Sequence, residues 1–170
     1  MWCAMADLES EKRDLPRPGS LLRDPLMLLA LGFGSGLVPR APGTVGSGAA
    51  LVFMPVLSMM PLWGYGVFLL VAFAAGVGLC EYAQRRLKGH DHPAIVWDEF
   101  VGVWLTLSCV PPSWGWWLAG FVVFRVFDIF KPWPINVIDR KIAGGLGVML
   151  DDLLAGVGAW AVMMMGLWLL

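Results

Sequence analysis

Two pairs of adjacent carboxylates, Asp98–Glu99 and Asp151–Asp152, lie beside long apolar stretches of this sequence, and Asp128 stands in a third such stretch. Carboxylates within apolar, membrane-like segments are costly to bury and by default indicate function. Hard oxygen ligands of this kind suit Mg²⁺, which binds through one or two carboxylates, keeps some waters and takes up phosphate oxygens. The alternative interpretation is that these acids only cap helix ends or lie solvated at an interface.

Two basic residues, Arg125 and Lys131, flank Asp128 in "FRVFDIFKPWP". On a helix each of them shares a face with Asp128, since each is three residues away from it. Cations among carboxylates are explained if the ligand is a phosphate, because basic groups neutralise phosphoryl oxygens while acids hold a metal. A purely structural network of ion pairs is the alternative. Pro132 and Pro134 are expected to end this helix.

Three of the four residues 144–147 are glycine, and they predict a flexible turn before the second aspartate pair. Adjacent residues on a helix point about 100° apart, so both aspartates cannot face one metal equally well. We therefore expect unequal roles. Asp152 is the expected direct ligand, and Asp151 is expected to bridge to water, to a second metal or to Lys131.

The stretch "GFGSGLVPRAPGTVGS" (32–47) combines glycines with two prolines that interrupt helix. Gly43 permits a tight turn there, and Thr44 is expected to cap the following helix. Exposed backbone N–H groups at such a helix start attract a phosphate, with Arg40 nearby to help. No Gly-Lys-Ser/Thr closes the stretch, so it is not a P-loop. A plain loop with a helix cap explains it equally well.

His90 and His92 flank Asp91 and suggest a softer metal than Mg²⁺. A loop histidine is more often simply solvated, and the role of these two residues stays open.

The composition points to an integral membrane protein. Of the 170 residues, 58% are hydrophobic and only 15% are charged, where a soluble domain would have about a quarter charged. The net charge of −1 argues against nucleic acid as a partner. Residues 1–21 are polar, lack the pattern of a signal peptide and are expected to form a mobile cytoplasmic tail. Residues 22–170 are expected to form one membrane-embedded domain.

The apolar segments predict an all-α, polytopic membrane helix bundle with about five spans. A shorter segment, Pro25–Pro39, contains glycines and is expected to be a half-helix or re-entrant piece. Some spans are short against the ~20 residues that cross the hydrocarbon layer, so local thinning has to compensate. The five expected spans are Val45–Trp63, Tyr65–Cys80, Ala94–Val110, Trp114–Phe130 and Val148–Leu170.

The charges predict which end of the bundle faces the cytoplasm. Every Lys and Arg lies in one of three blocks, Lys12–Arg40, Arg85–Lys88 and Arg125–Lys141. The turns Met60–Gly66 and Val110–Trp117 carry no charge but contain Trp and Tyr. Basic loops stay cytoplasmic, so the N-terminus is expected inside and the C-terminus outside. The acids then all fall at the cytoplasmic ends of the spans.

Three stretches of the chain resemble the phosphatidylglycerophosphatase A family of bacteria. They are "GFGSGLVPRAPGTVGS", "HDHPAIVWDEFVG" and "FRVFDIFKPWPINVIDRKIAGGLGVMLDDLLAG", and with their spacers they cover about Leu26–Ala159. The resemblance implies an all-helical, Mg²⁺-dependent phosphatase of the inner membrane. Such an enzyme removes the terminal phosphate of phosphatidylglycerophosphate and leaves phosphatidylglycerol, as a step of phospholipid biosynthesis.

With this resemblance, each candidate residue receives an expected role. Metal-assisted attack by water is favoured, since no Asp-x-Asp-x-Thr motif is present, although a covalent aspartyl intermediate stays open. Asp128 is a further metal ligand or the base that orients water, and Arg125 and Lys131 stabilise phosphoryl charge. The expected metal ligands are Asp98, Glu99, Asp151 and Asp152, and the expected phosphate-binding residues are Arg40, Gly43, Thr44 and Ser47.

Two other functions remain as alternatives. A CDP-alcohol phosphatidyltransferase also uses carboxylates and Mg²⁺ at the membrane face, and Gly147 and Asp151 fit its Gly-x3-Asp-x3-Asp pattern. The second aspartate of that pattern is replaced by Ala155 here. A small ion-coupled transporter would use the acids as relays, but would spread them across the membrane depth. The oligomeric state, the acyl-chain preference and the number of metal ions stay open.

Overall fold

The computed structural model describes residues 21–87, 92–133, 135, 142 and 144–169, and within these residues every regular element is helical. This confirms the all-α prediction. The predicted tail lies outside the described residues except for Leu21, which is buried in the core. The elements are α3 (Pro25–Ala30), η1 (Gly32–Leu37), α4 (Pro42–Ala50), η2 (Leu51–Phe53), α5 (Met54–Leu57), α6 (Leu62–Leu87), α7 (Trp97–Thr106), α8 (Trp114–Phe130) and α10 (Gly145–Leu169).

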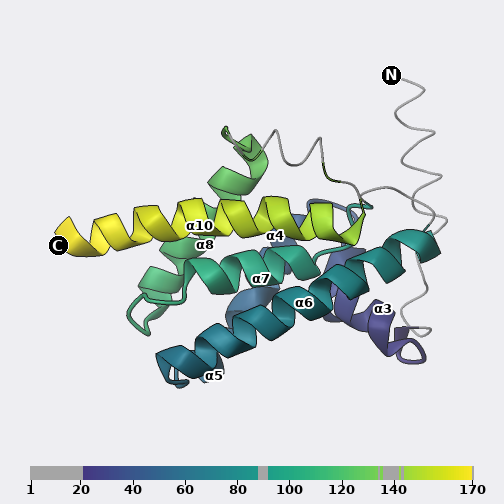
Figure 1. Ribbon diagram of the computed structural model, residues 1–170, viewed down its shortest axis with the longest axis horizontal. Coiled ribbons are helices and arrows are strands. Elements are labelled where there is room, and N and C mark those ends of the chain that lie inside the picture. Colours follow the sequence, from purple (N-terminus) through teal and green to yellow (C-terminus); the bar gives the residue numbers. More distant parts are fainter. Residues whose placement is uncertain (1–20, 88–91, 134, 136–141, 143, 170) are drawn as a thin grey trace.

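The short helix α7 lies at the centre of the fold. It packs against α10, α6, α4 and α8, and Figure 1 shows it between α10 and α6. Eight of its ten residues are buried, so α7 has no wide face to offer to a surrounding solvent or lipid. The indole N–H of Trp104 donates to the Ala50 carbonyl at 3.1 Å, and that of Trp97 donates to the Ala72 carbonyl at 3.1 Å. These bonds fix α7 to two of its neighbours.

Small residues let the backbones of α7 and α10 approach closely. A Cβ added at Gly156 would lie 2.8 Å from the carbonyl oxygen of Gly102, and one added at Gly102 would lie 2.9 Å from the carbonyl oxygen of Asp152. Glycine at a helix crossing is typical of helices packed inside membranes, where close van der Waals contact replaces a hydrophobic driving force. The crossing places the second turn of α10 beside α7.

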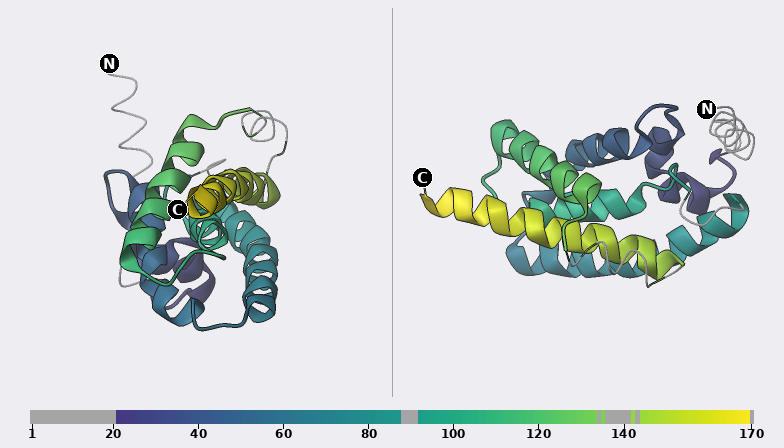
Figure 2. Two further views of the ribbon diagram at one scale, coloured as in Figure 1. Left: turned by 90° about the vertical axis from the view of Figure 1, so that its left-hand side faces the viewer. Right: turned by 90° about the horizontal axis from the view of Figure 1, so that it is seen from above.

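The helices alternate in direction, so the bundle has one polar end. The start of α10 contacts α6 near its last turn, where the Gly145 N–H donates to Glu81. At the other end, the Tyr65 hydroxyl near the start of α6 donates to the Trp104 carbonyl near the end of α7, at 2.7 Å. The two views in Figure 2 show the same alternation. Five helix ends therefore gather at one end of the bundle: the starts of α4, α7 and α10 and the ends of α6 and α8.

Two helices of the described chain are long and apolar enough to cross a membrane, α6 with 26 residues and α10 with 25. Both were among the five expected spans, although α6 is longer than predicted. A membrane bundle is plausible on this basis, and the count of five spans stays a prediction. The expected span Trp114–Phe130 coincides with α8. The expected span Val45–Trp63 is instead divided among α4, η2 and α5.

The N-terminal segment matches the predicted half-helix. It forms the six-residue helix α3, and then a 3₁₀ segment, η1, that is kinked at Phe33 and Gly34. Both kink residues have positive φ values, 57° and 94°. Neither α3 nor η1 is longer than six residues, and the chain changes direction between them, so this segment does not form a full span.

Two local predictions are wrong. Helix α4 begins at Pro42, one residue after Ala41 adopts a left-handed conformation (φ 50°), and no side chain caps it. Thr44 therefore lies inside the first turn rather than capping it, and Gly43 is helical rather than part of a turn. Glycines 145 and 147 do not form a flexible turn either. Gly145 begins α10 and Gly147 lies in its first turn. A Cβ at Gly145 would meet the Val77 carbonyl oxygen at 2.2 Å, so glycine here allows close approach to α6.

Candidate active site

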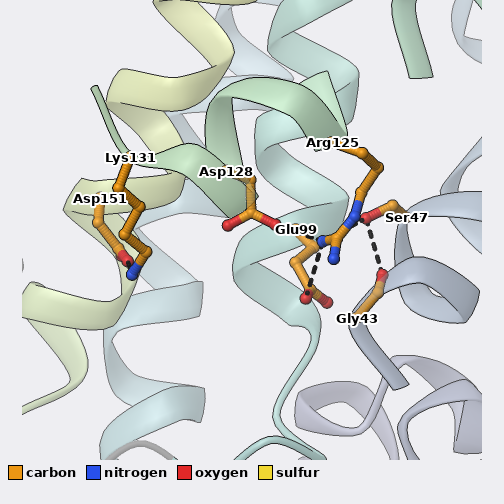
Figure 3. Close-up of polar contacts among 7 residues, drawn as sticks. All are labelled: Gly43, Ser47, Glu99, Arg125, Asp128, Lys131 and Asp151. Atoms are coloured by element: carbon orange, nitrogen blue, oxygen red, sulfur yellow. Dashed lines mark hydrogen bonds and ion pairs between the residues drawn. The ribbon is translucent and has the colours of Figure 1, made fainter. Parts of the chain in front are cut away.

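Four helix ends bring most of the predicted residues together. Arg125 and Asp128 come from the last turns of α8, Glu99 from the first turn of α7 and Ser47 from α4. Asp151 comes from the second turn of α10, and Figure 3 shows these side chains pointing toward one another. The motifs are far apart in sequence and meet only in the folded chain.

Arg125 lies at the centre of one half of the site. Its Nη1 donates to Asp128 in an ion pair three residues apart on α8, as the sequence predicted. The same atom lies 3.5 Å from Glu99 Oε1 and 3.4 Å from Ser47 Oγ. Ser47 is itself fully buried and donates from Oγ to the Gly43 carbonyl at 2.8 Å. The guanidinium is thus oriented by α4, α7 and its own helix.

Glycine in α4 lets this helix approach Glu99. A Cβ added at Gly43 would lie 2.0 Å from Glu99 Oε1 and 3.2 Å from Arg125 Nη1. One added at Gly46 would lie 2.9 Å from Glu99 Oε2. The "GTVGS" sequence therefore provides room for a carboxylate from α7. This explains these glycines better than the predicted loop turn does.

Lys131 defines the other half of the site. It ends α8 in a left-handed conformation (φ 39°, ψ 61°), and its backbone N–H donates to the Phe127 carbonyl. Pro132 follows directly, which confirms the predicted helix end; Pro134 lies outside the described residues. The Lys131 ammonium donates to Asp151 Oδ2 at 2.5 Å. The lysine thereby joins α8 to α10 across the site.

Asp98 and Asp152 complete the cluster of acids, and both are buried. The negative charge of Asp152 is repelled by four other carboxylates, namely Asp98, Asp128, Glu99 and Asp151. Oδ2 of Asp152 and Oε2 of Glu99 are buried and have no hydrogen-bond partner among the described residues. Buried carboxylate oxygens normally have a partner, so these two are candidate ligand atoms for a metal.

The donor set fits a divalent cation. Among the described residues, five carboxylates gather with two cations, Arg125 and Lys131, and an excess of buried negative charge needs a counter-charge. Among the described residues, no group of three or more His, Cys, Asp or Glu side chains is arranged so that it could hold a metal ion. Mg²⁺ does not require such a group, because it binds through one or two carboxylates and fills its remaining positions with waters and substrate phosphate.

Some predicted residues lie away from this cluster or outside the described chain. Arg40 and Thr44 are exposed, and their expected contact with phosphate stays a prediction. His92 is buried, and its Nδ1 accepts the Ala94 N–H at 3.2 Å, so it is not a solvated loop histidine. His90 and Asp91 lie outside the described residues. Glu81, which the sequence analysis did not consider, contacts the start of α10.

Comparison with known proteins identifies the family. The model of a family described as Phosphatidylglycerophosphatase A matches residues 28–167, which include the whole cluster. The chain belongs to this family. The family predicted from the three motifs is therefore confirmed.

The relatives within the family cover most of the chain. A phosphatidylglycerophosphatase A of Escherichia coli is 44% identical over 146 residues, 85% of each chain. One of Haemophilus influenzae is 46% identical over 140 residues, 81% of this chain and 86% of the relative. A protein of Bacteroides thetaiotaomicron named putative phosphatidylinositol-3-phosphatase is 36% identical over 155 residues, 85% of this chain and 94% of the relative. No solved structure matches the chain.

Proposed function

We propose that this protein is a lipid phosphatase that hydrolyses the terminal phosphate of phosphatidylglycerophosphate and leaves phosphatidylglycerol. Membership of the family supports the reaction, since the relatives in E. coli and H. influenzae carry the name of this activity. The observation that carries the proposal is the polar end of the bundle. Arg125 and Lys131 are held there among five carboxylates, which is the charge pattern of a site for a phosphate and a metal.

The surface of the bundle supports a place in the membrane. Exposed apolar side chains follow one stripe of α6 (Trp63, Val67, Leu70, Val71) and one of α8 (Leu118, Val122, Val126, Ile129). Exposed apolar stripes of this kind promote aggregation in water, whereas they are favourable in contact with lipid. We infer that the protein is a multi-pass protein of the bacterial inner membrane. Its basic end faces the cytoplasm, at the depth of a lipid headgroup.

Mg²⁺ is the proposed cofactor. Asp98, Glu99, Asp151 and Asp152 are the candidate residues, of which one or two would hold each ion. When bound, Mg²⁺ supplies positive charge that stabilises phosphoryl oxygens and lowers the pKa of a bound water. Glu99 and Asp152 are the strongest candidates among these ligands, because each has a buried oxygen with no hydrogen-bond partner in the part of the chain that the structure describes.

The side chains of the protein supply the remaining steps. Arg125 and Lys131 bind the phosphoryl oxygens and stabilise the charge that develops on them. Asp128 either orients the attacking water and takes its proton, or serves as a further ligand. Water forms a bond to phosphorus, the ester P–O bond breaks, and the leaving glycerol oxygen takes a proton. Inorganic phosphate and the lipid alcohol are the products.

The two alternatives receive less support. A CDP-alcohol phosphatidyltransferase needs a second aspartate four residues after Asp151, and Ala155 at this position is fully buried. A transporter needs polar groups across the membrane depth. The acids of the cluster instead gather at a single end, where α7 and α10 begin and α8 ends.

A panel of phosphomonoesters tests the proposal. Purified protein in lipid–detergent micelles is supplied with phosphatidylglycerophosphate, with phosphatidylinositol 3-phosphate and with water-soluble glycerol 3-phosphate, and released phosphate is measured. The second lipid is included because of the name of the B. thetaiotaomicron relative. We expect the highest kcat/KM for phosphatidylglycerophosphate. A preference for the inositol lipid would overturn the substrate assignment, and no release from any of the three would overturn the phosphatase.

A further inference from the structure

Glu81 lies in α6, outside the motifs that carry the family resemblance, and it contacts the helix that carries two of the proposed ligands. Its Oε2 accepts the backbone N–H of Gly145 at 2.9 Å. Gly145 is the first residue of α10, so the carboxylate of one helix caps the start of another. The other oxygen of Glu81 lies 2.9 Å from Nη2 of Arg85, one turn further along α6.

Helix α10 needs this acceptor from elsewhere. The first N–H groups of a helix lack partners within the helix, and a negative charge near them is stabilising. No acidic residue lies in the first turn of α10 itself. The Gly144 carbonyl accepts the N–H groups of Gly147 and Val148, which leaves the Gly145 N–H to Glu81. The acid that this helix start requires is supplied by α6.

The same contact fixes where α10 begins. A Cβ added at Gly145 would lie 2.2 Å from the Val77 carbonyl oxygen, so the two backbones touch at this point. Gly144 has a φ of +81°, and a Cβ there would lie 2.9 Å from Glu81 Oε2. Both glycines are in close contact with α6. A shift of the start of α10 along α6 would therefore break the hydrogen bond between the Gly145 N–H and Glu81.

We propose that Glu81 is a positioning residue for the reaction, and this inference rests on the proposed phosphatase function. Asp151 lies six residues, about 9 Å along the helix axis, from the capped N–H. Because α10 is one continuous helix, a shift or fraying of its start moves Asp151 and Asp152 relative to α7 and α8. Glu81 holds both aspartates in register with Lys131 and Glu99 without touching the substrate.

Three substitutions separate the role of the cap from the role of the charge. Glu81→Gln keeps an oxygen that accepts the Gly145 N–H, Glu81→Asp keeps the charge but retracts it by one methylene, and Glu81→Ala removes both. Asp24→Ala is the matched control. Asp24 also caps a helix start, accepting the Met27 N–H at 3.1 Å, and also binds a second helix through the Tyr82 hydroxyl at 2.9 Å. It caps α3 and has no part in placing α10.

The readouts are kcat and KM for phosphate release, the Mg²⁺ concentration for half-maximal rate, and hydrogen exchange of the amides of residues 145–150. We expect Glu81→Ala and Glu81→Asp to lower kcat about tenfold to a hundredfold, as for a small misplacement of catalytic groups. They should also raise the Mg²⁺ requirement and speed amide exchange in 145–150. Glu81→Gln should restore most of the kcat, and Asp24→Ala should leave kcat and the Mg²⁺ requirement unchanged.

Several results overturn the inference. A folded Glu81→Ala or Glu81→Asp protein with normal kcat does so. Glu81→Gln with a loss as large as that of Glu81→Ala also does so, because a neutral acceptor of the Gly145 N–H would then not be enough. An equal loss in Asp24→Ala would reduce Glu81 to a contribution to stability. The wild-type protein is assayed in parallel. If it releases no phosphate, the proposed function is overturned, whatever the rate of amide hydrogen exchange in residues 145–150.

Discussion

Lys131 and Asp151 are joined by a hydrogen bond of 2.5 Å that connects the end of α8 to the second turn of α10. The neighbouring Asp152 is buried among carboxylates, and its Oδ2 has no hydrogen-bond partner among the described residues. The two adjacent aspartates therefore have different surroundings, as the 100° between neighbouring helical side chains requires. The contact between Asp151 and Lys131 was one of the predicted alternatives, and which aspartate binds the metal stays a prediction.

The first prediction concerns this aspartate pair. Asp152→Asn should lower kcat at least about a hundredfold, because it removes charge from a proposed direct ligand of the metal. Asp151→Asn should cost less, since its carboxylate is shared with Lys131. Both proteins should insert and stay folded, because removing one of several buried like charges relieves repulsion. Phosphate release and thermal unfolding in detergent measure the two effects. Near-normal rates in both variants would reduce the pair to an interface cap.

Arg125→Lys should be almost as damaging as Arg125→Ala. Nη1 of the guanidinium contacts Asp128, Glu99 and Ser47 at once. A lysine ammonium cannot both keep these contacts and offer a planar pair of further N–H donors to a phosphate. We expect a loss of about a hundredfold in kcat/KM for either substitution. Steady-state kinetics at saturating Mg²⁺ check it. Full activity of Arg125→Lys would mean that only a positive charge is required, and would contradict the proposed geometry.

Gly43→Ala tests the approach of α4 to the site. The added Cβ would lie 2.0 Å from Glu99 Oε1, so Glu99 or the helix must move. We expect a loss of about tenfold or more in kcat. Gly48→Ala, in the same helix, is the matched control, because a Cβ there has no neighbour within 4 Å. It should be neutral or slightly stabilising, since alanine favours helix. Equal activity of the two variants would refute the idea that Gly43 makes room for Glu99.

Labelling of single cysteines tests the topology. Arg85 near the end of α6 and Met59 before its start are exposed and lie at opposite ends of this helix. In a background with Cys3, Cys80 and Cys109 replaced by alanine, Met59→Cys should react with a membrane-impermeant thiol reagent added to intact cells. Arg85→Cys should react only after the membrane is opened. The reverse pattern would invert the proposed orientation.

The sequence predicted the elements whose ends carry strong local signals. The bounds of α8 were predicted correctly because an uncharged turn with two prolines precedes Trp114 and Pro132 follows Lys131. The acids were placed at one end because they lie at the boundaries of apolar stretches. The Arg125–Asp128 pair followed from the spacing of three residues alone.

The remaining features depend on contacts between distant segments. Gly43 and Gly145 look like turn residues in the sequence, but the structure uses their lack of a side chain for close approach to Glu99 and to Val77. Thr44 was assigned as a cap because Thr is a good cap, yet Pro42 begins the helix. Glu81 was missed although a carboxylate late in a long apolar helix is itself a signal. Only the fold shows that it meets Gly145.

The central claim is that buried carboxylates at one end of the bundle hold Mg²⁺ for hydrolysis of a lipid phosphomonoester. Its most direct test is phosphate release from phosphatidylglycerophosphate by the purified protein across a Mg²⁺ titration. Wild type and Asp152→Asn are compared, each with a parallel sample in excess chelator. We predict no release in chelator, full recovery with Mg²⁺ in the wild type, and a large loss of rate or a higher Mg²⁺ requirement in Asp152→Asn. Full activity in chelator, or the same Mg²⁺ titration and rate for both proteins, would contradict it.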